Sequence, residues 1–231
     1  MFIRMLTIVF VVSSVIFSWV AYQWIEVIHR GGPVMIPIIL CSIFGLAVAI
    51  EKKVQLYRAK IDTDKFLNDI METIRKLKIK EAIDKCDSVQ SPISRILKAG
   101  IAKYNHSKEE IRQAMEDASL YEIPMLEKNL TALATIGHIS PLLGLLGTVT
   151  GLVRCFQSIQ LSSSEFAPIN PGALAGGIWE ALITTVAGLI VAIPIFVIYN
   201  YLVSRVNNFI LEMERSATEL VNFIYEHKRE R

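Results

Sequence analysis

Long apolar blocks constrain the fold of this chain more than any other feature of its sequence. Three blocks have the roughly 20 residues that a helix needs to cross a hydrocarbon core about 30 Å thick, and a fourth lies at the short end of that range. The blocks are Leu6–Trp24, Leu130–Val153, Ala173–Val203 and the shorter Val34–Ile50. Backbone groups find no partners in lipid, so spanning segments close their hydrogen bonds internally as helices. We therefore expect an all-α integral membrane protein.

The basic residues predict how these spans are oriented. Of 24 Lys and Arg residues, 16 lie in 51–128 and 5 in 205–231. Since an excess of basic residues beside span ends marks the cytoplasmic side, both segments are expected in the cytoplasm. This gives three core transmembrane helices plus an extra N-terminal hydrophobic helix, with a helical cytoplasmic domain inserted between the second and third spans.

Five segments follow from this topology. The first apolar block is longer than a usual signal-peptide core and no A-x-A-like cleavage site follows it, so we favour an uncleaved span over a signal-like segment. The segments are 1–25, the extra span; 26–50, an interfacial helix and a span; 51–128, the cytoplasmic domain; 129–204, a transmembrane hairpin; and 205–231, a C-terminal cytoplasmic helix.

The cytoplasmic segment carries helix signals and no catalytic motif. Ser107 and Glu110 have the spacing of a capping box, and Ser91 before Pro92 is expected to cap another helix. Pro124 is expected to kink or interrupt the helix before the third span. Acidic and basic residues alternate along 51–128, as in a solvated domain, and the net charge of +2 does not suggest nucleic acid. We expect no metal site, no cofactor and a scaffold or docking role for this segment.

Glu180 is the only charged residue between Pro171 and Arg205. A carboxylate at membrane depth is costly, so such groups usually face a bundle interior or a wet cavity. Glu180 lies eight residues after Gly172, about 12 Å along a helix, which is too deep for easy contact with water. Thr184 and Thr185 follow it and could line a polar path, although threonines in apolar helices often bond only their own backbone.

Small residues recur at three- and four-residue steps in the last two apolar blocks. Such residues let helix backbones approach closely in lipid, where contact drives association. We expect close packing, within the chain or between copies, at Gly144, Gly147, Gly151, Gly177, Ala181 and Gly188.

Four sequence patches in order resemble the MotA/TolQ/ExbB proton-channel family, and its ExbB/TolQ branch most. They are GGPVMIPIILCSIFGLAVAIE at 31–51, EAIDKC with SPISRILKAG at 81–100, SPLLGLLGTVTGL at 140–152 and GIWEALITTVAGLIVAIP at 177–194. The resemblance implies polar pore residues at Glu180, Thr148 and Thr185, and less securely at Thr184, which stands where alanine is common.

The same resemblance implies partners and a location. It implies a homo-oligomeric ring, typically a pentamer, in the bacterial inner membrane around a single-span protein of the ExbD/TolR type. Proton flow would energise a TonB- or TolA-like protein that acts on the outer membrane. The extra block Leu6–Trp24 departs from the usual start of that branch.

Other readings remain open from the residues alone. A non-conducting helical scaffold would use Glu180 and the glycines only for packing. A small-solute transporter would need internal repeats with broken helices, which we do not find. An intramembrane enzyme would need a second catalytic group, and His138 is the only candidate. His138 matches no family role. It is expected near the cytoplasmic side of the third span, whereas Glu180 is expected toward the outer side of the last span.

Overall fold

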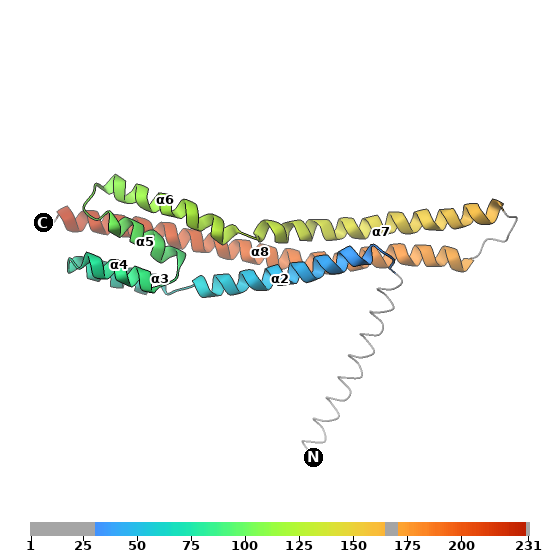
Figure 1. Ribbon diagram of the computed structural model, residues 1–231, viewed down its shortest axis with the longest axis horizontal. Coiled ribbons are helices and arrows are strands. Elements are labelled where there is room, and N and C mark those ends of the chain that lie inside the picture. Colours follow the sequence, from blue (N-terminus) through green and yellow to red (C-terminus); the bar gives the residue numbers. More distant parts are fainter. Residues whose placement is uncertain (1–30, 165–170, 230–231) are drawn as a thin grey trace, which may run out of the picture. The chain divides into compact units, whose positions relative to one another are not determined.

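All the regular secondary structure in the described part of the chain is helical. The computed structural model describes residues 31–164 and 171–229, and this part contains seven helices in the order shown in Figure 1. They are α2 (Met35–Ala59), α3 (Thr63–Arg75), α4 (Ile79–Ser88), α5 (Pro92–Ala102), α6 (Lys108–Glu127), α7 (Leu130–Ser164) and α8 (Pro171–Arg229). The predicted span Leu6–Trp24 and the first residues of the predicted interfacial helix lie outside the described residues.

Three of these helices, α2, α7 and α8, are long and apolar enough to cross a membrane. The helical fold is therefore confirmed for the described residues, and three helices have the length and apolar composition that the predicted core spans need. Each of the three helices continues beyond its apolar block, and α8 runs without a break to Arg229. Pro141 and Pro194 lie inside α7 and α8 without ending either helix.

The helices divide into two compact units. Of the described residues, one unit contains 31–46, 135–164 and 171–196, and the other contains 47–134 and 197–229. The first unit holds most of the apolar sequence of α2, α7 and α8. The second holds α3 to α6 together with the remaining parts of the three long helices.

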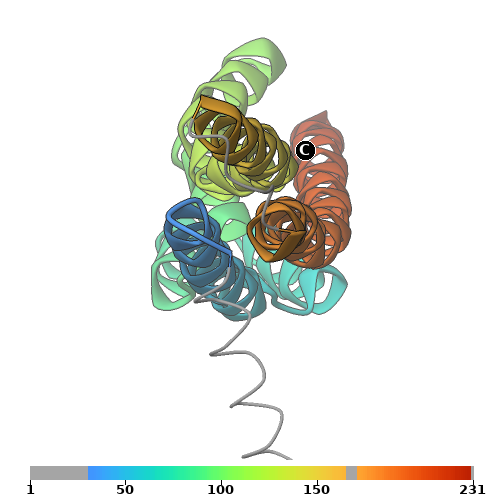
Figure 2. The ribbon, with the colours of Figure 1, turned by 90° about the vertical axis from the view of Figure 1, so that its right-hand side faces the viewer.

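In the first unit the three helices lie side by side, as the view along their axes in Figure 2 shows. Gly45 of α2 is so close to α8 and α7 that a Cβ there would lie 2.5 Å from Ile195 Cδ1 and 3.4 Å from Ile136 Cγ2. The outward faces remain apolar, with Phe44 and Leu142 more than 60% exposed. Such faces suit contact with lipid or with another transmembrane helix.

The second unit has an ordinary aliphatic core. Ile70, Ile74, Ile96, Leu97 and Ile101 are fully buried, and all five lie at helical spacing on the faces that α3 and α5 turn inward. Ser107 caps α6 as predicted, since its hydroxyl accepts a hydrogen bond from Glu110 N–H.

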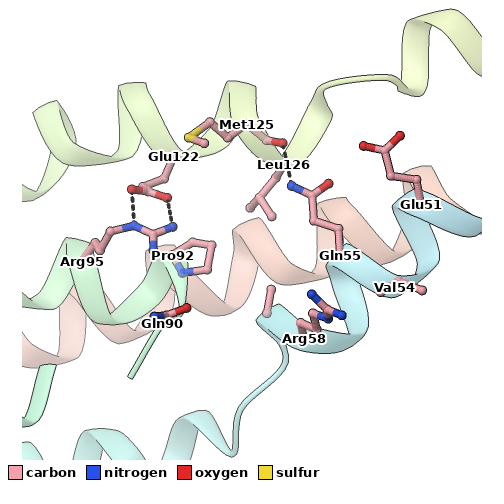
Figure 3. A pocket seen from close by; sticks show the side chains of 11 residues that line it. Glu51, Val54, Gln55, Arg58, Gln90, Pro92, Arg95, Glu122, Met125 and Leu126 are labelled. Carbon is pink, nitrogen blue, oxygen red and sulfur yellow. Dashed lines mark hydrogen bonds and ion pairs between the residues drawn. The ribbon is translucent and has the colours of Figure 1, made fainter. Parts of the chain in front are cut away.

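An ion pair joins α5 to α6 within this unit. The Arg95 guanidinium donates from Nε and Nη2 to the two carboxylate oxygens of Glu122, each at 2.5 Å (Figure 3). The Glu122 side chain is only 11% exposed. The hydrogen bond to Glu122 raises the pKa of Arg95, so the guanidinium keeps its positive charge at any physiological pH.

Two local predictions in this unit differ in detail from the structure. Ser91 precedes α5 as predicted, but its hydroxyl donates to the carbonyl of Ala59 at 3.0 Å instead of capping the helix. Pro124 does not end α6, which continues to Glu127. The break comes at Lys128 and Asn129, where Asn129 adopts a φ of 70°, a left-handed conformation that Asn tolerates better than most residues.

Candidate functional site between two apolar helices

Helices α7 and α8 approach each other through their small residues. A Cβ on Gly144 would lie 3.0 Å from both the carbonyl oxygen of Thr184 and the Cα of Thr185. A Cβ on Gly151 would lie 2.8 Å from the carbonyl oxygen of Gly177. The remaining predicted packing residues take part in the same contact: Gly147 faces Thr184, Gly151 also faces Ala181, and Gly188 faces Ser140. This close approach of α7 and α8 brings backbone and side-chain oxygens of the two helices within hydrogen-bonding distance.

Thr148 of α7 and Thr185 of α8 meet at this contact. Their hydroxyl oxygens are 2.5 Å apart, and either one could be the donor. Both hydroxyls also lie near the carbonyl of Gly144, Thr148 at 3.1 Å and Thr185 at 3.2 Å. A hydroxyl both donates and accepts, so this pair is a short polar link between the apolar stretches of the two helices.

Thr184 is arranged differently from its neighbour. It is fully buried, and its hydroxyl donates to backbone carbonyls of its own helix, at 2.9 Å to Ala181 and 3.1 Å to Glu180. Its side chain fills the space left by Gly147, where a Cβ would overlap Thr184 Oγ1. Thr184 therefore packs the helices together, while Thr148 and Thr185 present the hydroxyl pair.

Glu180 lies one turn before these threonines and makes an ion pair that the sequence reasoning missed. Its Oε1 accepts a hydrogen bond from Nη1 of Arg154, which lies in the second half of α7. The Glu180 side chain is 14% exposed, whereas that of Arg154 is 47% exposed. The carboxylate is thus largely withdrawn from solvent while its counter-ion reaches outward.

The turn before α2 closes over this ion pair. Gly32 has a φ of 66°, which disfavours any residue with a side chain. A Cβ at Gly32 would overlap Glu180 Oε1 and lie 3.2 Å from Arg154 Nη1. Conformation and space both require glycine at this position, so the surroundings of Glu180 include α7, α8 and the turn before α2.

The carboxylate and the hydroxyl pair form a polar series along α8. Thr185 lies five residues after Glu180, about 7.5 Å along the helix axis, so a water molecule or a group from another chain would have to bridge them. A signal for Arg154 was available in the sequence. An antiparallel hairpin pairs residues at similar distances from its connecting loop, and Arg154 precedes that loop by about as much as Glu180 follows it. His138 is far from this series and packs edge-on against Phe196, with ring centroids 4.9 Å apart.

The profile of the MotA/TolQ/ExbB proton channel family matches residues 88–215, which include α7, the hydroxyl pair and the ion pair. The chain belongs to this family, and the predicted resemblance is confirmed. It is therefore a multi-pass membrane protein and a channel-type stator subunit, and it is not an enzyme. Membership also implies a complex with a partner of the ExbD or MotB kind.

Individual relatives agree with this assignment. The ExbB homolog of Methanothermobacter thermautotrophicus is 30% identical over 191 residues, covering 82% of this chain and 66% of that protein. The ExbB-like 3 protein of Synechocystis sp. is 34% identical over 176 residues, covering 74% of this chain and 80% of that protein. The biopolymer transport protein ExbB of Neisseria meningitidis is 29% identical over 194 residues, covering 76% of this chain and 85% of that protein.

A solved structure shares the fold. The structure of C. jejuni MotAB contains a chain that superposes with a TM-score of 0.63 over 95% of this chain and 87% of that one. The two sequences are only 19% identical, so this likeness bears on the fold alone.

Proposed function

We propose that this chain conducts protons through an inner-membrane complex and thereby powers work at the outer membrane, in a TonB- or Tol-type system for transport of biopolymers or nutrients. The single observation that carries the proposal is the polar series on α7 and α8, in which a largely buried Glu180 precedes the hydroxyl pair of Thr148 and Thr185. Relatives named biopolymer transport protein ExbB support the transport role.

Each group of the series has a role in this proposal. Glu180 accepts and releases the proton, because it is the only titratable side chain between Pro171 and Tyr199. Thr148 and Thr185 extend the path by donating and accepting in turn. Arg154 is the counter-ion that holds the Glu180 carboxylate when it is charged. Thr184 and the small residues keep the two helices close enough for the hydroxyls to meet.

The series needs other chains to become a path across the membrane. Thr148 and Thr185 are only half-buried in the isolated chain, so their outer side is free to face another helix. We propose that copies of this chain form a ring, a pentamer by family resemblance, around helices of an ExbD/TolR-like single-span protein. A TonB- or TolA-like protein would receive the motion. The segment 51–128 and the C-terminal end of α8 would lie in the cytoplasm.

Proton flux into liposomes tests this function. The full chain is reconstituted with and without an ExbD/TolR-like single-span protein from the same organism, and flux is driven by a potassium diffusion potential. The proposal predicts partner-dependent flux above that of empty liposomes. Absence of flux in both preparations, with both proteins inserted and associated, would favour the alternative of a non-conducting helical scaffold.

A further inference from the structure

A basic groove lies in the second unit, beside the residues at which two apolar blocks end. It has a volume of about 290 Å³ and lies between α2 and the middle of α8. Its lining includes Lys53, three residues after the apolar block of α2, and Arg205, two residues after the apolar block of α8. Lys60 contributes a third cation from the residue that follows α2. The groove therefore begins where the apolar sequence of both helices ends.

The charge in this groove is not balanced. Among the described residues that line it, Glu212 is the single acid against three cations. None of the ion pairs between described residues involves Lys53, Lys60 or Arg205. Elsewhere in the same unit basic side chains are commonly paired, as in Arg95 with Glu122 and Lys98 with Asp87. An excess of cations in a groove between helices is a feature that attracts phosphate groups.

Two tyrosines line the groove beside these cations, and one of them contacts Arg205. Arg205 Nε donates to the Tyr201 hydroxyl at 3.0 Å, and its guanidinium lies 5.3 Å from the Tyr201 ring centroid. These contacts fix the guanidinium at the groove while its other N–H groups remain available. Tyr57 is 82% exposed in the same groove. Tyrosine is enriched where membrane meets water, because its ring is apolar and its hydroxyl is polar.

We propose that this groove binds the headgroup of an anionic phospholipid, with the phosphate on Lys53, Lys60 and Arg205. Basic pockets between transmembrane helices on the cytoplasmic side are a recognised way to bind anionic headgroups. Continuity with the apolar surfaces of α2 and α8 favours a lipid over free phosphate, since its acyl chains would lie along those helices. The topology proposed above assigns the lipid to the cytoplasmic leaflet, but binding does not depend on proton conduction.

The test counts lipids that stay bound to the full chain. Protein is reconstituted in nanodiscs of phosphatidylcholine with a minor fraction of phosphatidylglycerol, extracted gently and analysed by native mass spectrometry. The variant K53Q/K60Q/R205Q is compared with K65Q/K80Q/K103Q, which removes the same charge from exposed cations outside the groove. The single variant Lys60→Gln provides the comparison if the triple groove variant does not fold.

The proposal predicts that wild-type protein and the control variant retain phosphatidylglycerol in preference to phosphatidylcholine. The triple groove variant should retain about tenfold less, and Lys60→Gln an intermediate amount. Equal retention by the groove and control variants would overturn the proposal. Complete displacement of the lipid by millimolar inorganic phosphate would also overturn it, because the groove would then be a site for free phosphate.

Discussion

Replacing Thr148 with valine separates conduction from packing at the helix contact. Valine keeps the branched shape of threonine but exchanges the hydroxyl for a methyl group. The change removes the 2.5 Å contact with the Thr185 hydroxyl and the 3.1 Å bond to the Gly144 carbonyl. If the hydroxyl carries protons, the flux should fall far more than the stability of the protein.

The expected losses of stability and of proton flux differ in size. Hydrogen bonds between membrane helices contribute about 0.6 kcal/mol on average and at most about 1.7 kcal/mol in double-mutant cycles. Thr148→Val should therefore lower the free energy of unfolding by about 1 kcal/mol. An interrupted relay should lower proton flux at least about tenfold, which corresponds to about 1.4 kcal/mol or more in the barrier.

The assay measures both quantities on the same preparations. Proton flux is followed by a pH-sensitive dye in liposomes that also contain the partner protein, and stability by denaturation in mixed detergent. Thr150→Val is the matched control, because Thr150 is also half-buried on α7 but its hydroxyl donates to the carbonyl of Gly147 in its own helix. The control variant should conduct normally.

A second substitution sharpens the result. If the two hydroxyls act as one link, the double variant Thr148→Val/Thr185→Val should conduct no worse than either single variant. Equal flux in Thr148→Val and Thr150→Val, with similar stabilities, would refute the role of the hydroxyl pair and leave Thr148 as a packing residue.

Three further predictions follow from the same contacts. Arg154→Gln should lower the free energy of unfolding by about 2 kcal/mol, a value between those for exposed and buried ion pairs, because it leaves the Glu180 carboxylate unpaired. It should also reduce proton flux about fivefold. Arg154→Lys should recover most of the flux, and equal losses of flux in both variants would argue against a counter-ion role. Gly147→Ala should destabilise the protein by about 1–3 kcal/mol through overpacking against the facing threonine, whereas Gly176→Ala, with open space around it, should not; denaturation of both variants decides. Burial raises the pKa of the Cys86 thiol from 9.0 to about 12, so this thiol should resist alkylation at pH 8 until the unit unfolds, and rapid labelling of the folded protein would contradict this. The stability that Cys86 contributes should be complete below pH 9 and decline as the pH rises toward 12, because the thiol of the unfolded chain loses its proton first.

Much of the fold was predictable because its signals are local. Apolar block length identified α2, α7 and α8, and the predicted third span and α7 both begin at Leu130. The Ser107 cap depends only on residues within one helical turn. These features follow from hydropathy and backbone hydrogen bonding within a short stretch of sequence.

What could not be predicted depends on residues distant in sequence. The Ser91 hydroxyl is drawn to the carbonyl of Ala59, 32 residues away, which no local rule anticipates. To predict the partner of Glu180, one would need to know the register of the α7–α8 hairpin. To predict the contact with Gly32, one would need to know the position of the turn before α2. The different orientations of Thr184 and Thr185 also follow from helix rotation that spacing alone does not fix.

The most direct test of the account changes the Glu180 carboxyl group alone. Proton flux is measured in liposomes that contain the partner protein and either wild-type chain, Glu180→Gln or Glu180→Asp, with insertion and association checked for each. The account predicts no flux above empty liposomes for Glu180→Gln and reduced but measurable flux for Glu180→Asp, because the proposed role of residue 180, to bind and release the proton, needs a carboxyl group. Wild-type flux through Glu180→Gln would contradict it.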